Sequence, residues 1–238
     1  MKGLVVISTY NEGANIRRLL DELLQQGLDI QILVMDDKSP DGTAELVRQY
    51  GKSDPRVRCI ERTGLRGRGA AGIDGFREAV KSSVDYVVEM DADFSHEPSF
   101  VPRFLPALEK ADVVIASRLV LGGGDLGRGP LRKTLTMAAC WWIRTWLGVP
   151  VGDCTAGFRC FRRTILAKVD WDKMQSVGPS IVEEVLWTLH RAGVRIAEIP
   201  LVLQPRAAGK SQLNFKKLMN TLWVVSSLRF QSPRLLKI

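Results

Sequence analysis

Short apolar runs alternate with helical patterns through the first half of the chain. Each run is rich in β-branched residues and has the length of a buried strand, while the stretches between them carry apolar residues three or four positions apart. The apolar runs cover residues 4–8, 30–35, 57–61, 86–90 and 113–116, and the helical stretches cover 16–24, 43–50, 70–81 and 98–110. This order predicts an α/β fold with a mostly parallel sheet flanked by helices and joined by right-handed crossovers.

Length and composition favour an ordinary globular protein of the cytoplasm. The 238 residues suffice for one large α/β domain or two small ones, and 45% of them are hydrophobic. The four cysteines form no Cys-x-x-Cys pair and are too few for a disulfide scaffold, so we expect reduced thiols. The apolar run at the N-terminus is too short for a signal peptide, and no window of about 20 residues lacks charge as a spanning helix requires.

Polar residues gather where four of the predicted strands end. The clusters are residues 9–12, Asp36 with Asp37, Asp91 with Asp93, and Ser117 with Arg118. The carboxyl ends of parallel strands share one edge of the sheet, and open α/β sheets bind their ligands there. Several acidic groups on one edge predict a nucleotide pocket, in which carboxylates contact base and ribose while a metal ion holds a diphosphate.

Two aspartates follow an apolar strand directly. Asp91 and Asp93 are separated by Ala92, and because the backbone bends where a strand gives way to a turn, their carboxylates can converge on one point. Mg²⁺ and Mn²⁺ prefer oxygen ligands and often complete their shell with phosphates. The pattern predicts a metal and diphosphate site. Its alternative is a solvated turn in which Asp93 or Ser95 caps the following helix.

The two halves of the chain differ in charge. Residues 1–117 carry 15 basic and 19 acidic side chains and residues 118–238 carry 19 and 7, so the net charge of +8 divides into −4 and +12. A basic half indicates an anionic partner, such as nucleic acid, a phosphorylated substrate or an acidic membrane, or else a merely solvated surface. A glycine and arginine loop at 62–69 precedes a helix whose first N–H groups could hold an anion; a flexible surface loop is the alternative.

Beyond residue 118 the chain changes character. The glycine-rich segment 122–130 is predicted to be a lid or linker. A helix predicted over 131–147 has one apolar stripe and a basic opposite side. The stripe consists of Leu131, Leu135, Ala138, Trp142 and Trp146, and the opposite side of Arg132, Lys133, Thr136 and Arg144. Tryptophan favours the membrane boundary and basic side chains favour lipid phosphate, so we expect this helix to lie on a bilayer; a core helix is the alternative.

The last third of the chain carries further polar groups. The polar stretch 151–159 is expected to return toward the sheet. A helix over 181–191 has Glu183 and Glu184 in its first turns, where acidic residues often favour the positive helix end. From residue 213 a second amphipathic helix would lie on a membrane or pack on a partner's transmembrane helix. The loop before it offers cations and a hydroxyl suited to a phosphate, namely Arg206, Lys210 and Ser211.

Taken together, these motifs resemble the inverting family 2 glycosyltransferases. The resemblance rests on Ser-Thr-Tyr-Asn-Glu at 8–12, Asp-Asp-Lys-Ser-Pro-Asp-Gly-Thr at 36–43 and Met-Asp-Ala-Asp-Phe-Ser-His at 90–96. Segments 117–118, 153–159 and 206–211 narrow it to the branch typified by dolichol-phosphate, or polyprenol-phosphate, mannose synthase. It extends through residue 215, and the ordered set is specific although no single motif is.

The resemblance implies a GT-A fold and the transfer of mannose, with inversion, from GDP-mannose to a polyprenyl or dolichyl phosphate. The catalytic domain would span 1–212, with a nucleotide-binding half at 1–117 and an acceptor half at 118–212 that includes the interfacial helix 131–147; an amphipathic helix and tail would follow at 213–238. The enzyme would be peripheral to the cytoplasmic face of a membrane, alone or with small membrane-protein subunits, and would bind no nucleic acid.

The resemblance also assigns roles to single residues by motif match. The nucleotide sugar would be contacted by Thr9, Tyr10, Glu12, Asp36, Asp37, Asp91, Ala92 and Asp93. Asp91 and Asp93 would hold Mg²⁺ or Mn²⁺. Phosphate groups, including that of the acceptor, would be gripped by Arg118, Arg132, Arg206, Lys210 and Ser211. The catalytic set would be Asp91, Asp93, Arg118 and Glu184, with Glu184 orienting the sugar.

Two positions differ from the motifs of the relatives, and three alternative functions remain open. Ser95 stands where some relatives have Gln, and Lys210 precedes Ser211 where relatives commonly have Ser-Lys, so the cation that meets the acceptor phosphate is open. A sibling enzyme could move sugar from UDP-glucose or UDP-N-acetylglucosamine to the same lipid. A nucleotidyltransferase would normally carry a glycine and lysine-rich loop near its first strand. A basic nucleic-acid-binding protein would explain the basic half but not the aspartate clusters.

Overall fold

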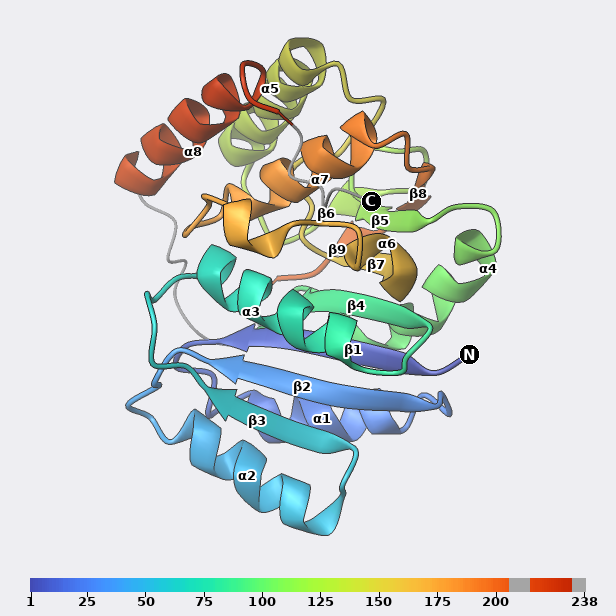
Figure 1. The fold of residues 1–238 in the computed structure, drawn as a ribbon, viewed down its shortest axis with the longest axis vertical. Coiled ribbons are helices and arrows are strands. Elements are labelled where there is room, and N and C mark those ends of the chain that lie inside the picture. Colours follow the sequence, from blue (N-terminus) through green and yellow to red (C-terminus); the bar gives the residue numbers. More distant parts are fainter. Residues whose placement is uncertain (206–214, 233–238) are drawn as a thin grey trace.

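The computed structural model is built on one seven-stranded sheet with helices on both faces (Figure 1). It describes residues 1–205 and 215–232, with the backbone alone for residues 215–218. The strands of the sheet follow the order β3-β2-β1-β4-β7-β5-β8. Their bounds are β1 Gly3–Thr9, β2 Ile30–Asp36, β3 Val57–Glu61, β4 Tyr86–Asp91, β5 Val113–Ser117, β7 Arg159–Arg162 and β8 Ile196–Pro200. Two short strands, β6 Gly124–Asp125 and β9 Val202–Leu203, pair separately.

The predicted helices are present with one exception, and the short helix α6 and the turn η2 were not predicted. The helices are α1 Ile16–Leu24, α2 Thr43–Ser53, α3 Arg68–Lys81, α4 Phe104–Leu108, α5 Pro130–Leu147, α6 Arg163–Leu166, α7 Ile181–Arg191 and α8 Phe215–Leu228, with 3₁₀ turns η1 Pro98–Arg103 and η2 Trp171–Lys173. The continuous helix expected over 98–110 is wrong. Pro102 lies inside this segment, and because a proline removes a backbone donor and clashes with the preceding turn, a 3₁₀ turn runs into the short α4 instead.

The mostly parallel sheet that the sequence predicts is confirmed. β1 pairs in parallel with β2 and β4, β2 with β3, and β5 with β8. β7 is antiparallel and lies between β4 and β5. The polar stretch 151–159 returns to the sheet as expected and enters it at Arg159. The pattern Arg-Cys-Phe-Arg did not predict a strand because it lacks both an apolar run and a clean alternation.

Alternate residues of the central strands supply two cores, one on each face of the sheet. Val5 of β1 lies in the cluster formed with α1, α2 and α4, whereas its neighbour Val6 lies in the cluster formed with α3, α5 and α7. Successive side chains of a strand point to opposite faces, so burial on both faces requires the continuous apolar runs seen in the sequence. The sheet is therefore covered on both sides, and its carboxyl edge is left for the site.

α5 and α8 pack together at the opposite end of the molecule from β3 and α2 (Figure 1). The stripe expected on α5 is wrong at its C-terminal end: Trp142 and Trp146 are half-buried against the core, whereas Trp141 is 68% exposed. The α5 residues that enter the core are Cys140, Ile143 and Leu147. Each residue turns a helix by about 100°, so an error of one position moves a side chain from the core to the surface.

The glycine-rich segment 122–130 is tied to the end of the sheet. Its strand β6 pairs in parallel with β9, with Gly124 opposite Val202.

In the part of the chain that the structure describes, no helix combines the length and the apolar character needed to cross a bilayer.

We expect Gly75→Ala to destabilise the fold, because α3 packs directly on the sheet at this point. A Cβ on Gly75 would fall inside van der Waals contact with Val6 Cγ1 and lie 3.3 Å from Met35 Cγ. Overpacking of this kind costs about 1–3 kcal/mol, against a gain of up to about 1 kcal/mol when alanine replaces glycine in a helix. The control is Gly72→Ala on the same helix, where the new Cβ would lie 3.6 Å from Glu89 Oε1. Urea unfolding should give the lower midpoint for Gly75→Ala, and the reverse order would contradict this packing.

Candidate functional site

The carboxyl ends of β1, β2 and β4 lie next to one another and carry most of the predicted site. In the parallel register, Thr9 is opposite Asp36 and Ser8 is opposite Asp91. β5 points the same way as β4, because both are antiparallel to β7 between them. Arg118, just past β5, therefore lies on the same edge of the sheet. The convergence of strand-end clusters that the sequence predicts is present.

Three residues just past these strand ends have left-handed backbone conformations. Asn11, Lys38 and Phe94 have φ angles of 61°, 56° and 61°, and they follow β1, β2 and β4. In the described part of the chain, no other residue except glycine has a positive φ. Such a conformation costs roughly 1–2 kcal/mol for a residue with a side chain. Strain gathered on one edge indicates turns shaped for a ligand.

Asp36 and Asp37 use their carboxylates to hold these turns in place. Asp36 is fully buried and accepts hydrogen bonds from Thr9 Oγ1 at 2.8 Å and Ser39 Oγ at 2.6 Å. Asp37 accepts a hydrogen bond from Gly67 N at 2.8 Å. The two acids thus join the loops after β1, β2 and β3, and their expected contact with a nucleotide stays a prediction.

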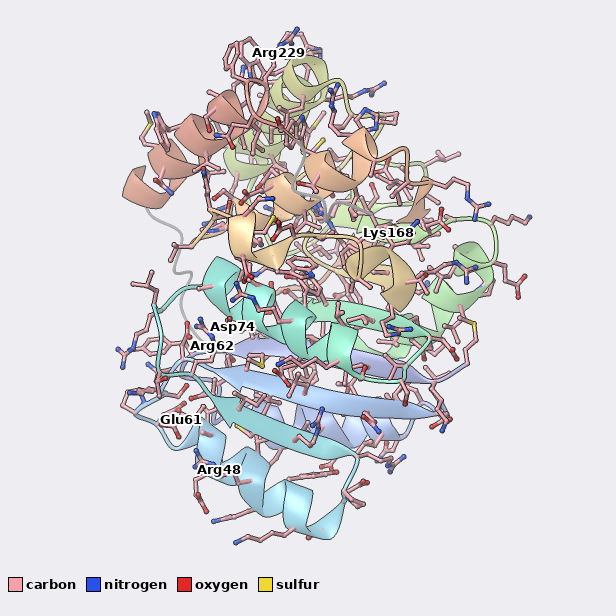
Figure 2. All side chains as sticks on the ribbon, in the orientation of Figure 1. Arg48, Glu61, Arg62, Asp74, Lys168 and Arg229 are labelled. Carbon is pink, nitrogen blue, oxygen red and sulfur yellow. The ribbon has the colours of Figure 1, made fainter. Side chains whose placement is uncertain are left out.

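Arg62 connects the same edge to α3. Its side chain is buried, pairs with Asp37, and donates from Nε to Asp74 Oδ2 at 2.8 Å. Figure 2 shows Arg62 and Asp74 close together, while the pair of Arg48 and Glu61 lies farther toward α2. Arg62 therefore links Asp37 to α3.

The other residues expected to contact a nucleotide differ in exposure. Tyr10 is 38% exposed, and the guanidinium carbon of Arg66 lies 5.7 Å from its ring centroid. Glu12 accepts a hydrogen bond from Asn15 Nδ2 at 2.8 Å, and Ala92 is buried. The Tyr10 ring is thus an accessible flat surface on which a base could stack.

Asp91 and Asp93 supply carboxylate oxygens at the end of β4. Asp93 is buried, and its Oδ1 accepts hydrogen bonds from Ser95 N at 3.1 Å and Ser95 Oγ at 2.6 Å. The side chain of Asp91 is 32% exposed, and its Oδ1 lies 3.0 Å from Arg68 Nε. The helix cap considered as the alternative does not form, because the turn that begins after Glu97 has no side-chain cap.

The two carboxylates fit a hard divalent cation that takes its other ligands from elsewhere. Mg²⁺ and Mn²⁺ bind carboxylate oxygens and usually retain water or phosphate ligands. Among the described residues, no three acidic, histidine or cysteine side chains converge closely enough to hold a metal ion by themselves. Arg68 already places a positive charge beside Asp91, so a metal ion there would have to compete with this guanidinium. Asp91 and Asp93 could therefore hold an ion together with a diphosphate.

His96 supports the end of β4. Its Nδ1 accepts a hydrogen bond from Asp91 N at 3.0 Å, and its ring stacks on Phe158 with a centroid distance of 4.7 Å. Burial lowers the pKa of His96, in agreement with a neutral ring whose Nδ1 is an acceptor. His96 therefore fixes the backbone beside the two aspartates.

Arg68 is a site residue that sequence reasoning noted only as part of a loop. It is the first residue of α3, and its Nη2 lies 3.7 Å from Glu89 Oε1 in addition to the contact of Nε with Asp91. The anion site considered at this helix start is not formed by backbone groups, because the N–H groups of residues 69–70 donate to Val177 O. The signal that could have located Arg68 is the alternation that puts Glu89 and Asp91 on one side of β4.

Arg118 forms a buried ion pair at the end of β5. Its Nε and Nη2 donate to the two carboxylate oxygens of Asp153 at 2.6 and 2.5 Å, and Nη2 also donates to Thr155 Oγ1 at 2.7 Å. Burial acts to lower the pKa of Arg118, but the hydrogen bonds and charge of Asp153 outweigh it and the pKa is raised. Burial likewise acts to raise the pKa of Asp153, and Arg118 lowers it overall.

Arg128 adds a second guanidinium near Arg118, which sequence reasoning did not single out. It pairs with Asp125 and donates from Nη1 to Thr136 Oγ1 at 3.4 Å. Burial and then the positive charge of Arg118 lower the pKa of Arg128. The two guanidinium groups therefore repel each other, and a phosphate is the kind of group that would relieve this repulsion.

The remaining predicted phosphate ligands lie partly outside the structure. Arg132 is in the first turn of α5, and its side chain is exposed. Arg206, Lys210 and Ser211 lie outside the described residues. Contacts of these four residues with a phosphate stay predictions.

Glu183 and Glu184 are both buried at the start of α7 but have different surroundings. The carboxylate of Glu184 accepts hydrogen bonds from Gln175 N at 3.0 Å and Ser176 N at 2.8 Å, so it holds the loop before α7. Glu183 has a buried Oε2 without a hydrogen-bond partner, and burial raises its pKa to about 7. The motif match selected Glu184, which holds this loop, whereas Glu183 is the acid with an unpartnered carboxylate oxygen.

Known proteins resemble this chain in sequence and in fold. The family model described as glycosyl transferase family 2 matches residues 4–170. The undecaprenyl-phosphate mannosyltransferase of Micrococcus luteus is 37% identical over 214 residues, which cover 90% of this chain and 88% of that protein. The polyprenol monophosphomannose synthase of Mycolicibacterium smegmatis is 35% identical over 226 residues, which cover 94% and 85%.

A solved structure matches the fold. It is glucosyl-3-phosphoglycerate synthase from Mycobacterium tuberculosis in complex with Mn²⁺, uridine diphosphate and phosphoglyceric acid, with a TM-score of 0.67 and 23% identity over 94% of this chain and 78% of that chain. At this identity the likeness concerns the fold alone. The predicted α/β GT-A fold is thereby confirmed.

We expect Glu183→Gln to stabilise the protein above neutral pH. Because burial raises the folded-state pKa from 4.5 to about 7, the folded protein retains a proton that the unfolded chain releases, and the free energy of unfolding falls as pH rises through this window. Glutamine cannot ionise, so the free energy of unfolding of the variant should exceed that of the wild type by about 3 kcal/mol at pH 8 and by little near pH 4.5. The control Glu184→Gln should lose stability at pH 8, because its carboxylate accepts backbone N–H groups. Urea unfolding from pH 4.5 to 8 checks both; equal stability of Glu183→Gln and wild type at pH 8 would contradict the raised pKa.

Proposed function

Because the chain belongs to glycosyl transferase family 2, we propose that it transfers mannose, with inversion, from GDP-mannose to the phosphate of a polyprenyl or dolichyl phosphate. The two relatives with polyprenyl-phosphate mannose activities in their names support the sugar and the acceptor class. The observation that carries the proposal is the single sheet edge on which the Asp91 and Asp93 carboxylates lie between the turns after β1 and β2 and the guanidinium groups beyond β5.

The donor half would use the turns after β1 and β2 together with the end of β4. Tyr10 would stack on the base and Glu12 would contact the ribose, while the buried Thr9, Asp36 and Asp37 keep the turns in shape. Asp91 and Asp93 would hold Mg²⁺ or Mn²⁺, which would offset the charge that develops on the leaving diphosphate. The structural neighbour solved with Mn²⁺ and uridine diphosphate supports a metal of this kind.

The acceptor half would position an anionic nucleophile. An acceptor phosphate needs no strong base to deprotonate it, so the site has to align it with the sugar and shield its charge. Arg118 and Arg128, with Arg132 in the first turn of α5, would surround this phosphate. Its oxygen would form the new bond to the anomeric carbon as the bond from sugar to diphosphate breaks. Glu184 would orient the sugar indirectly, through the loop before α7. The further phosphate ligands proposed are Arg206, Lys210 and Ser211.

α5 and α8 present exposed apolar side chains beside the acceptor half. We call them the α5/α8 apolar face, which consists of Leu131, Leu135, Met137, Trp141, Met219, Trp223 and Phe230. Arg144 is exposed on α5, and Arg229 follows α8 at the same end of the molecule (Figure 2). Exposed tryptophans beside arginines suit a lipid interface. This face would rest on the cytoplasmic surface of a membrane that contains the acceptor, and a small membrane protein could cover part of it.

The internal use of arginines weakens the nucleic-acid alternative. In the basic second half, Arg118, Arg159 and Arg162 donate to carboxylate or backbone oxygens inside the fold. Binding of DNA or RNA requires basic groups that can reach phosphates on the surface. These three arginines therefore serve the fold, and the alternatives worth testing are sibling donors.

A transfer assay followed by mass spectrometry tests the proposal. Purified protein, a short polyprenyl phosphate and Mg²⁺ or Mn²⁺ are offered GDP-mannose, UDP-glucose or UDP-N-acetylglucosamine in parallel. We expect a mannosyl phospholipid from GDP-mannose alone. Asp91→Ala should lower the rate by at least about 100-fold, because stabilisation of the leaving group is worth several kcal/mol. The control Asp172→Ala changes a surface carboxylate that pairs with Arg77 and should keep the rate.

The results with the different donors show which part of the proposal is wrong if it fails. Transfer from a UDP-sugar would keep the chemistry and change the donor. No lipid product from any of the donors would contradict the acceptor, and a normal rate for Asp91→Ala would contradict the metal role.

The α5/α8 apolar face predicts membrane binding that depends on its tryptophans. Trp141 and Trp223 are 68% and 70% exposed, so Trp141→Glu with Trp223→Glu should leave the core intact. The double variant should bind anionic vesicles at least about tenfold more weakly, because two large apolar groups are lost and negative charge is added. The control Leu65→Glu changes a residue that is 72% exposed on the loop before α3 and should bind like the wild type. Vesicle flotation measures binding, and unchanged flotation of the double variant would contradict the assignment of this face.

A further inference from the structure

Arg68 contacts one carboxylate oxygen of the aspartate that is proposed to bind the metal ion. Its Nε is 3.0 Å from Asp91 Oδ1 and its Nη2 is 3.7 Å from Glu89 Oε1. Its side chain is 26% exposed, so the protein covers most of it. A metal ion that binds Asp91 therefore meets a carboxylate that already has a positive partner.

The surroundings hold Arg68 in this position. Its guanidinium lies directly on Gly157, where any side chain would overlap Arg68 Nη2. The start of α3 is fixed as well, because Gly67 N donates to Asp37 at 2.8 Å and residues 69–70 donate to Val177 O. The contact with Asp91 is thus part of the packed structure and is not an incidental surface pair.

The charges around Arg68 give it a specific task. Glu89 and Asp91 are two residues apart on β4, so their side chains lie on the same side of the strand and their negative charges repel. Arg159, the other guanidinium near Glu89, uses its donors on backbone carbonyls of residues 154, 156 and 182. Arg68 is the guanidinium whose direct contacts with both carboxylates the structure records.

We propose that Arg68 is the resident counter-ion of the metal site, bound to Asp91 when the donor is absent and released when a divalent cation and a nucleotide diphosphate bind together. The inference rests on the metal role of Asp91 in the proposed function. A cation alone must compete with Arg68 for Asp91 and should bind weakly. The diphosphate gives the released guanidinium a new anionic partner, so metal and nucleotide should bind more tightly together than either does alone.

The first test is a Mn²⁺ titration without nucleotide, in which electron paramagnetic resonance measures the concentration of the free ion. Arg68→Leu should bind Mn²⁺ at least about tenfold more tightly than the wild type, because a competing charge-assisted hydrogen bond has been removed. Arg77→Leu, on the same helix but paired with Asp74 and Asp172 on the surface, should leave the Mn²⁺ affinity unchanged. In the presence of Mn²⁺, Arg68→Leu should bind GDP about tenfold more weakly than the wild type.

Thermal unfolding supplies a readout that needs neither nucleotide nor acceptor. Without metal, Arg68→Leu should melt below the wild type, because Glu89 and Asp91 lose their shared partner. Saturating Mn²⁺ should then raise its melting temperature by more than that of the wild type. Arg68→Gln removes the charge with less change in polarity and should behave in the same direction, so it takes the place of Arg68→Leu if the latter does not fold.

Asp91→Ala separates this inference from the proposed function. If Asp91→Ala and the wild type bind Mn²⁺ equally, the metal role of Asp91 is wrong and both proposals fail. If Asp91→Ala loses Mn²⁺ while folded Arg68→Leu and Arg68→Gln remain within about twofold of the wild type, Arg68 is a structural arginine and this inference alone is overturned.

Discussion

The hydrogen bonds of the buried Arg159 guanidinium hold together the segments that support the site. Its three donor groups bind the carbonyl oxygens of Ala156, Val182 and Cys154 at 2.7, 2.6 and 2.9 Å, and Arg159 lies opposite Glu89 in the register of β7 and β4. A buried charge is tolerated only when its hydrogen bonds are made and an opposite charge is near. β7, the loop before it and the start of α7 are therefore fixed relative to β4, and the aspartates at the end of β4 gain a rigid frame.

The parallel part of the fold could be predicted because local patterns decide it. Apolar runs buried on both faces, separated by amphipathic helices, leave few arrangements other than a parallel sheet. β7 could not be predicted, because Arg159 is stabilised by carbonyl groups that only the folded chain brings near. The prediction of the exposed side of α5 failed for a similar reason, since Trp141 and Trp142 are equally apolar and only packing in the folded chain leaves Trp142 half-buried and Trp141 exposed.

The site could be predicted as far as acids at strand ends reveal it. Asp91 ends a mostly apolar strand and Asp93 follows it, and this contrast can be recognised in the sequence alone. Ion pairs cannot be recognised in this way, because Arg68 and Asp91 are 23 residues apart in the sequence and Arg118 and Asp153 are 35 apart. Adjacent glutamates on a helix are equally ambiguous, since about 100° of rotation decides which one accepts backbone N–H groups and which one is left with a raised pKa.

The segment 153–159, which leads into β7, contacts two arginines of the proposed site. Asp153 orients Arg118 at the end of β5, on the side proposed for the acceptor phosphate. Gly157 gives Arg68 the space to reach Asp91, on the side proposed for the donor diphosphate. Loss of the carboxylate at 153 would release one guanidinium, and a side chain at 157 would displace the other. Because the same short loop positions both arginines, any change in its path alters the charge distribution of both halves together, and neither half can be shaped independently of the other.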